Sequence, residues 1–396
     1  MATIRPFKAW RPVREEAHAL SSVPYDIINT EEARSLYRTH AEEFLKVVRP
    51  EITTPEQEDI YSDSVYEAGR KNLYELLNSD RMVQDSIPRL YAYRLIQEEH
   101  EQLGVFGCVS VEEYDRNIIL KHELTRPAKE NDRTRHIHTQ HAHAEPVMMA
   151  FEDNAGIEDM LRKSLQHAEM VADFTHSDGV QHTIWKLDEF DDLAKAFRQV
   201  PNLYIADGHH RCAAASRVAK EFPENEEAQV FPAVLFPVRM LQILAYNRVL
   251  IHTDPSLIHH LLAVEGIEKT TKKTPDKPGD ICLYVKSEWY TISLPQTQSD
   301  TIDRTLDVAR LQEYILEPIL GIVDQRSDPG IDFVGGIRGT EELERMVDQG
   351  EASAGISMYP TSMKELVEVS EAGLLMPPKS TWFEPKLRSG LLIHTF

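Results

Sequence analysis

The sequence lacks the features that mark secreted or membrane-bound proteins. Its cysteines are few, odd in number and far apart (Cys108, Cys212 and Cys282), so a framework of disulfides is not expected. No uninterrupted apolar run approaches the roughly 20 residues of a membrane-spanning helix. The first residues also lack the charged and then apolar pattern of a signal peptide. We therefore expect a cytoplasmic protein with no membrane partner.

Basic residues are in the minority. The chain has 43 lysines and arginines against 65 aspartates and glutamates, which gives a formal net charge of −22. A field of this sign disfavours binding to nucleic-acid backbones and anionic lipids, so no nucleic-acid partner is expected. It does not exclude a small phosphorylated ligand, because a local cluster of cations can reverse the sign of the field within a cleft.

The pattern of apolar residues favours a mixed α/β fold. The chain of 396 residues is long enough for two or three domains, and its 41% of hydrophobic residues is sufficient to bury a core. Beyond residue 180, strand-like and helix-like segments alternate, as in an α/β layer. The predicted strands are 23–28, 44–49, 90–97, 104–111, 182–187, 203–206, 230–236, 242–250, 281–285, 289–294, 331–334 and 352–358. The predicted helices are 29–40, 60–77, 156–171, 191–200, 211–222, 306–320, 341–349 and 362–372.

The strongest candidate for chemistry is Asp207-Gly208-His209-His210-Arg211, between a predicted strand and a predicted helix. A turn into a helix leaves backbone N–H groups unpaired, and together with the helix dipole they suit a phosphate or carboxylate. Gly208 permits close approach of an anion. His209, His210 and Arg211 add donors, and Asp207 could bind a metal ion or accept a proton. The alternative is a capped helix whose histidines bond to nearby loops.

The segment from His122 to Arg133 is the second candidate. Helical spacing places Arg126, Glu130 and Arg133 on one face. These residues either pair with one another, or Arg126 and Arg133 clamp phosphates while Glu123 acts as a general base or metal ligand. The histidines that follow have the composition of a metal site, but their spacing matches no standard zinc pattern. They are His136, His138, His141 and His143.

Two further segments are weaker candidates. In Lys379-Ser380-Thr381, a lysine and two hydroxyls in a proline-bounded turn could reach a phosphate, although a surface turn produces the same string. Around Tyr25-Asp26, the carboxylates of Asp26, Glu31 and Glu32 lie near a predicted strand end. A helix cap explains these acids equally well.

Together these segments resemble the bacterial and archaeal domain-of-unknown-function family ten-fifteen, in the family's order and over essentially the whole chain. The family's Asp-Gly-His-His-Arg element is similar to the phosphate-binding turn of ParB-like and sulfiredoxin-like domains, some of whose relatives phosphorylate free L-serine. The matching stretches are Val23-Pro24-Tyr25-Asp26, His122-Glu123 with Thr125 and Arg126, Asp207-Gly208-His209-His210-Arg211, and Lys379-Ser380-Thr381 with Pro385-Lys386.

The resemblance implies a ParB-like α/β core with insertions in residues 1–265 and a C-terminal α/β lobe in residues 266–396 that contributes to the same cleft. It implies an ATP- or ADP-dependent kinase that converts free L-serine to O-phosphoserine with Mg²⁺. A nucleotide or phosphoester hydrolase and a non-catalytic nucleotide-binding module are the alternatives. Whether the protein is a homodimer stays open.

The resemblance and the residues together assign three sets of roles. The expected catalytic residues are Glu123, Asp207, His209, His210 and Glu31, with Asp207 also the expected Mg²⁺ ligand. Glu31, Glu32 and Glu123 compete for the role of base, and Glu123 is preferred. The expected nucleotide-binding residues are Gly208, His209, His210, Arg211, Arg126, Arg133, Lys379, Ser380, Thr381 and Lys386. The expected serine-binding residues are Tyr25, Asp26, His122, Thr125 and Glu130.

Overall fold

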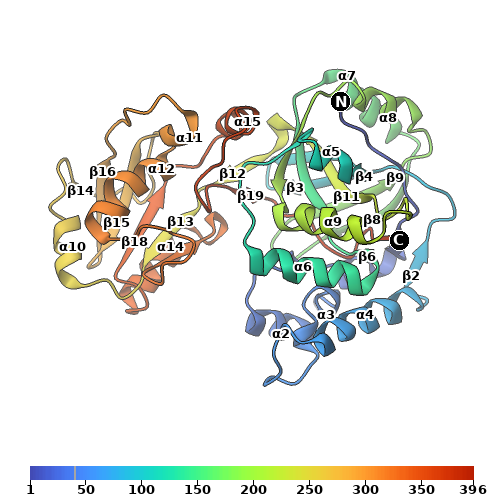
Figure 1. The fold of residues 1–396 in the computed structure, drawn as a ribbon, viewed down its shortest axis with the longest axis horizontal. Helices are drawn as coiled ribbons and strands as arrows, with labels where there is room; N and C mark the ends of the chain where they lie inside the picture. Colours follow the sequence, from blue (N-terminus) through green and yellow to red (C-terminus); the bar gives the residue numbers. More distant parts are fainter. Residues whose placement is uncertain (40–41) are drawn as a thin grey trace. The chain divides into compact units, whose positions relative to one another are not determined.

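The computed structural model describes residues 1–39 and 42–396. The chain packs as two compact units. Unit 1 consists of Met1–Lys121, Thr125–Leu241 and Pro385–Phe396, and unit 2 of His122–Leu124 and Gln242–Glu384. Both chain ends lie in unit 1 (Figure 1). The change between units therefore comes after Leu241, whereas the sequence analysis divided the chain after residue 265. That the C-terminal lobe contributes to the same cleft as the core stays a prediction.

Unit 1 is built on a mixed eight-stranded sheet with the strand order β5-β10-β7-β11-β4-β3-β9-β8. Strand β10 runs parallel to β5 and β11 runs parallel to β7, while the other neighbours are antiparallel. This confirms the mixed α/β fold class. The strands are β3 Tyr91–Gln97, β4 His100–Ser110, β5 Ile119–Leu120, β7 Val147–Phe151, β8 Glu169–Thr175, β9 Gln181–Lys186, β10 Leu203–Asp207 and β11 Val230–Pro237.

Helix α9 (His209–Glu221) packs on this sheet through small side chains. Cys212, Ala215 and Ala219 recur at helical spacing and join the core that β10, β7 and β11 form. Helix α6 (Pro127–Gln140) lies beside α9 (Figure 1), where its Ile137 packs against Ala214 of α9. The other helices of unit 1 are α1 Ala17–Leu20, α2 Thr30–Arg38, α3 Leu45–Val48, α4 Asp63–Leu77, α5 Val111–Asp115, α7 Ala155–Ser164 and α8 Asp191–Phe197.

The last twelve residues return to unit 1 after the chain has passed through unit 2. The backbones of Trp10 and Ile393 exchange two hydrogen bonds, and those of Ser22 and Ser389 do the same. Ile393 is fully buried among the residues of α1 to α4. The short strand β20 (His394–Thr395) pairs with β6 (Ala142–His143). This C-terminal tail, residues 385–396, is therefore an integral part of unit 1.

Unit 2 contains an antiparallel sheet of six strands in the order β14-β16-β15-β18-β13-β17. Its strands are β13 Asn247–Leu250, β14 Glu268–Thr270, β15 Asp280–Val285, β16 Glu288–Ser293, β17 Ile331–Val334 and β18 Ala354–Met358. A separate pair consists of β12 Gln242–Leu244 and β19 Trp382–Glu384. Its main helices are α10 Pro255–Leu261, α12 Asp307–Leu311, α13 Glu317–Leu320, α14 Gly339–Asp348 and α15 Met363–Glu371.

Some predicted elements are wrong. Residues 44–49 were predicted as a strand but form α3, because a short apolar run buried on several sides does not distinguish a strand from a helix. Residues 23–28 form a turn rather than a strand. The predicted helix 156–171 ends at Ser164, and β8 follows. The predicted strand 242–250 is two strands, β12 and β13. The predicted end of the first helix, His40, lies outside the described residues.

Gly107, within β4, is required by the packing of unit 1. A Cβ atom at this position would lie 2.6 Å from Leu90 Cδ2 and 2.7 Å from Ile4 Cγ1, both in the core. We predict that Gly107→Ala lowers the free energy of unfolding by about 1–3 kcal/mol, measured by urea denaturation. Gly156→Ala, at the start of α7, meets only one side-chain oxygen at 3.3 Å and serves as the control. An unchanged urea midpoint for Gly107→Ala would contradict this packing.

Candidate anion-binding turn

The predicted turn at residues 207–211 joins β10 to α9 within unit 1. Gly208 has φ +112°, in the left-handed region that favours glycine. The Arg211 side chain folds back over it, so a Cβ atom at position 208 would lie 3.0 Å from Arg211 Nε. Gly208 has no side chain to cap the first turn of the 13-residue helix α9. The glycine bend and the helix start are present, and binding of an anion there stays a prediction.

Asp207 lies between two cations. Its Oδ2 atom is 3.5 Å from Lys386 Nζ and 3.6 Å from Arg211 Nη2. Burial alone would raise the pKa of Asp207, but Lys386, Arg211 and His209 outweigh that effect and hold the pKa below its usual value. Asp207 is therefore ionised at neutral pH.

Arg211 and His210 connect the turn to neighbouring segments. The Arg211 guanidinium is 7% exposed and donates a hydrogen bond to the carbonyl oxygen of Pro146. The backbone N–H of Arg126 donates to Nε2 of His210 at 3.0 Å, so Nε2 is the unprotonated nitrogen of that ring. Since Arg126 is the residue before α6, this bond places the start of α6 beside the start of α9.

Behind the turn lies a buried network around Glu145. Its carboxylate accepts hydrogen bonds from Arg133 Nη1 at 3.1 Å, the Tyr25 backbone N–H at 3.3 Å and Ser389 Oγ at 3.4 Å. Burial raises the pKa of Glu145, while Arg133 and Arg211 act in the opposite direction. One carboxylate thus connects three segments of unit 1: the turn at residues 23–28 (the Tyr25 turn), helix α6 and the C-terminal tail. It also lies close to Arg211.

Arg133, a predicted phosphate ligand, is 5% exposed, and all three of its guanidinium nitrogens donate inside the protein. Nε and Nη2 bond to Asp132, and Nη1 to the Val48 carbonyl and to Glu145. The guanidinium carbon also lies 3.8 Å from the centre of the Tyr25 ring. Burial alone would lower the pKa of Arg133, but Asp132 and Glu145 raise it above its usual value.

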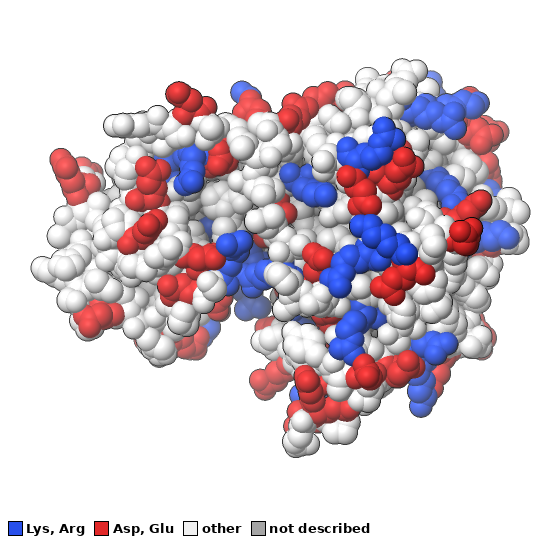
Figure 2. Space-filling view, in the orientation of Figure 1, with Lys and Arg blue, Asp and Glu red and all other residues white. Residues whose placement is uncertain are grey.

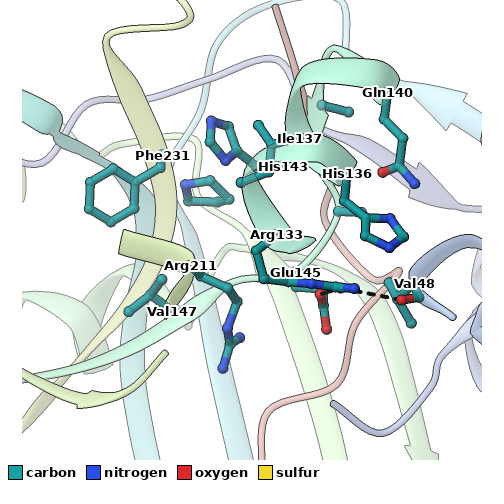
Figure 3. A pocket seen from close by; sticks show the side chains of 13 residues that line it. Val48, Arg133, His136, Ile137, Gln140, His143, Glu145, Val147, Arg211 and Phe231 are labelled. Atoms are coloured by element: carbon teal, nitrogen blue, oxygen red, sulfur yellow. Dashed lines mark hydrogen bonds and ion pairs between the residues drawn. The ribbon is translucent and has the colours of Figure 1, made fainter. Parts of the chain in front are cut away.

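A small internal cavity adjoins this network. Its volume is about 20 Å³, enough for roughly one water molecule. Figure 3 shows Arg133, Glu145 and Arg211 together, with His136 and His143 on the same lining. Nδ1 of His136 and Nε2 of His143 have no hydrogen-bond partner among the described residues. The cavity is far too small for a nucleotide, so it belongs to the supporting network.

At the start of α6, the predicted serine ligands Thr125 and Glu130 bind each other. Thr125 Oγ1 donates to Glu130 Oε2 at 2.6 Å, and Arg217 Nη1 lies 3.2 Å from Glu130 Oε1. Tyr25 is 4% exposed, with its pKa well above the usual value because of burial, and Asp26 is exposed. The structure therefore brings these four residues into unit 1 with the turn.

The remaining candidates fall into two groups. Glu31 is exposed at the start of α2, whereas Glu32 and Asn29 form a capping box, which is the alternative given for these acids. Five candidates belong to unit 2: His122, Glu123, Lys379, Ser380 and Thr381.

Within unit 2, most of these five candidates form local contacts. Nε2 of His122 lies 3.3 Å from Thr381 Oγ1, and Ser380 Oγ donates to the Pro377 carbonyl. The carbonyl of Lys379 accepts a hydrogen bond from the buried Arg248.

Two supporting features were not predicted. Glu145 gave only the signal of a lone acid just before the apolar segment that forms β7. The fixed position of Lys386 also depends on its neighbour Arg388, whose 3%-exposed side chain pairs with Glu42 and Asp178, each at 2.7 Å. Contacts that span 346 and 210 residues leave no local pattern in a sequence.

The distribution of charge is mixed. On the face of unit 1 shown in Figure 2, basic and acidic side chains alternate. Ion pairs of unit 1 include Arg217 with Glu130 and Arg162 with Glu158. Within residues 1–39 and 42–396, no group of three or more His, Cys, Asp or Glu side chains is arranged to hold a metal ion. The described cysteines are free and buried, and no described helix has the length and apolarity to cross a membrane.

The ion pairs of Asp207 lead to a prediction about pH. Because the pKa of Asp207 is lower in the folded protein than in the unfolded chain, its stabilisation is present above about pH 4 and is lost as the pH falls further. We predict that Asp207→Asn lowers the free energy of unfolding by roughly 1–3 kcal/mol at pH 7, since two cations lose their partner and the side chain is 23% exposed.

Urea denaturation at pH 7, 5 and 3.5 measures this effect, and the difference between wild type and variant should shrink at the lowest pH. Asp80→Asn, at an exposed site, is the control. A difference that grows on acidification would contradict the ion-pair assignment.

Comparison with solved structures gave similarities at low identity. SbnI from Staphylococcus aureus, with a C-terminal truncation, has a TM-score of 0.40 and 12% identity over 73% of this chain and 87% of that chain. A conserved hypothetical protein from Pyrococcus furiosus has a TM-score of 0.38 and 14% identity over 72% and 95%. A free serine kinase in complex with AMP has a TM-score of 0.39 and 11% identity over 72% and 92%.

Sequence comparison gives a clearer result. None of the curated proteins matches this chain. The model of one family, described as "Protein of unknown function (DUF1015)", matches residues 4–309. That range covers more than half of the chain and includes both the Tyr25 turn and the turn at residues 207–211. The chain therefore belongs to the DUF1015 family.

Proposed function

We propose that this protein is a nucleotide-dependent kinase that phosphorylates free L-serine. The observation that carries the proposal is the turn at residues 207–211, where a glycine bend, the start of α9 and the cations Arg211 and Lys386 occur together. The choice of serine as the acceptor is supported by the sequence resemblance of this turn to those of serine-phosphorylating ParB-like relatives.

In this proposal the donor phosphates bind at the start of α9. Backbone N–H groups in the first turn of a helix and the positive end of its dipole suit a phosphate. The Lys386 side chain is 13% exposed, and its hydrogen bond to Asp207 is long, at 3.5 Å, so a phosphate oxygen can compete for its ammonium group. Arg211, held by the Pro146 carbonyl, adds a second positive charge next to Gly208.

Phosphoryl transfer depends mainly on positioning and on neutralisation of charge. The serine hydroxyl oxygen would form a bond to the terminal phosphorus while the bond from that phosphorus to the nucleotide oxygen breaks. The hydroxyl proton would pass to a carboxylate of the protein. The nucleotide leaves with one phosphate fewer, and O-phosphoserine is the other product.

The described residues suit a magnesium ion that arrives with the nucleotide better than one held by the protein alone. Mg²⁺ commonly takes one or two carboxylates and completes its coordination with phosphates and water. Asp207 is the one acidic residue of the turn and would supply such a ligand. When bound, the ion would neutralise phosphate charge. Asp207 itself holds Arg211 and Lys386 in place.

Arg133 takes a supporting role in this proposal. Its guanidinium is fully used by Asp132, the Val48 carbonyl and Glu145, so it would fix the Tyr25 ring rather than contact a phosphate. His210 likewise joins the starts of α6 and α9 through its bond from the Arg126 N–H.

The first test is turnover. Purified protein with Mg²⁺, L-serine and either ATP or ADP should produce O-phosphoserine, detected by mass spectrometry, in proportion to the nucleotide consumed. Phosphate release that does not depend on added serine would favour a hydrolase instead. Nucleotide binding by calorimetry without turnover on any amino acid would favour a non-catalytic module.

The second test is the loss of charge at the turn. We predict that Lys386→Ala lowers kcat/KM for the nucleotide on the order of 100-fold, because one preorganised cation is removed from the phosphates. Arg211→Ala should have an effect of similar size. Lys195→Ala removes an exposed lysine that pairs with Asp192 on the same helix and should leave kcat/KM unchanged. Full activity in Lys386→Ala, with an unchanged urea midpoint, would refute its assignment to the phosphates.

A further inference from the structure

Lys129 carries a positive charge at an unfavourable position. It lies in the first turn of α6, where the helix dipole disfavours a cation. The side chain is half-buried, and burial lowers the pKa of its ammonium group. Among the described residues no hydrogen bond or ion pair holds this ammonium, and Nζ lies 5.8 Å from the centre of the Tyr25 ring.

Asp26 is one of two negative charges near Lys129; the other, Asp132, already pairs with Arg133. It follows Tyr25 in the turn, is exposed, and makes no hydrogen bond or ion pair with any described residue. Asp26 nevertheless lies close enough to affect the pKa values of Lys129, Arg211 and Tyr25. Lys129 and Asp26 thus sit within electrostatic reach of each other without forming a pair.

The surface between these two charges is rigid. The Tyr25 ring is 4% exposed and stacks on the Arg133 guanidinium at 3.8 Å. The Tyr25 backbone N–H donates to Glu145, and Arg49 donates to the Tyr25 carbonyl at 3.2 Å. The turn that carries Asp26 is therefore fixed relative to α6, which carries Lys129, and it lies near Arg211 of the proposed phosphate site.

We propose that Lys129 and Asp26 recognise the charged head of a free amino acid, with the α-carboxylate at Lys129 and the α-ammonium at Asp26. This inference rests on the proposed function and identifies the residues that hold the acceptor. A zwitterion satisfies both charges at once. A second phosphate would meet repulsion from Asp26, and a simple cation would meet repulsion from Lys129.

The proximity of Asp26 to Arg211 adds a geometric argument. Tyr25, which precedes Asp26, donates its backbone N–H to Glu145, and Glu145 lines the same small cavity as Arg211 of the turn at residues 207–211. The acceptor head and the donor phosphates would therefore occupy neighbouring positions within unit 1, as direct transfer requires.

Calorimetry with three small molecules tests the inference. L-Serine carries both charges, ethanolamine lacks the carboxylate, and L-glycerate lacks the ammonium. Lys129→Met should weaken L-serine binding at least tenfold and leave ethanolamine binding within twofold. Asp26→Asn should weaken L-serine binding at least tenfold and leave L-glycerate binding within twofold. Lys129→Arg, which keeps the charge, should retain most of the affinity for L-serine.

Lys46→Met is the matched control, because Lys46 is a similarly half-buried helical lysine of unit 1, and it should bind L-serine as the wild type does. The urea midpoint of each variant shows whether it is folded. The inference is overturned if wild type binds no L-serine with or without ADP, or if Lys129→Met binds it with wild-type affinity. It is also overturned if folded Lys129→Met loses ethanolamine and L-serine equally.

The outcome for the kinase proposal is separate. The expected binding pattern without any transfer from ATP or ADP would support the amino-acid site and reject the kinase. Serine phosphorylation with an unchanged KM for serine in Lys129→Met would reject the site and support the kinase.

Discussion

The buried carboxylate of Glu145 is the contact on which the arrangement of the candidate site depends. It holds one cation, Arg133, and accepts hydrogen bonds from the Tyr25 turn and from Ser389 of the tail. A carboxylate in an apolar interior is expensive unless charges and donors surround it. Here three separate segments meet because each supplies part of that compensation.

From this centre, opposite charges alternate outward to the turn. Asp132 and Glu145 flank Arg133, and Asp207 lies between Arg211 and Lys386. Such alternation keeps several arginines ionised and in fixed positions although they are removed from water. The inner members are fully occupied by protein partners, whereas Lys386 and Asp207 retain partial exposure. The inner ion pairs therefore fix the structure, while the partly exposed Lys386 and Asp207 remain able to bind a ligand.

Sequence reasoning located the turn and most of the strands, because local patterns encode them. The run from Leu203 to Arg211 contains a buried strand, a glycine and a helix start in nine residues. It did not predict α3, where the three apolar residues Leu45, Val47 and Val48 fit either a strand or a helix. Nor did it find Glu145, whose role depends on Tyr25, 120 residues away, and on Ser389, 244 residues away. Roles that arise only from long-range packing have no local signature.

The route of the tail bears on how unit 1 assembles. Most of unit 2, Gln242–Glu384, is inserted between Leu241 and Pro385, so Lys386 reaches Asp207 across 179 positions of the sequence. During synthesis, Asp207, Gly208 and Arg211 leave the ribosome long before Lys386, the second cation that pairs with Asp207. The sheet and α9 can form early, but the turn acquires its second cation only after the inserted unit has been made. Contacts of such long range are slow to close, which makes completion of this site a late event in the folding of the chain.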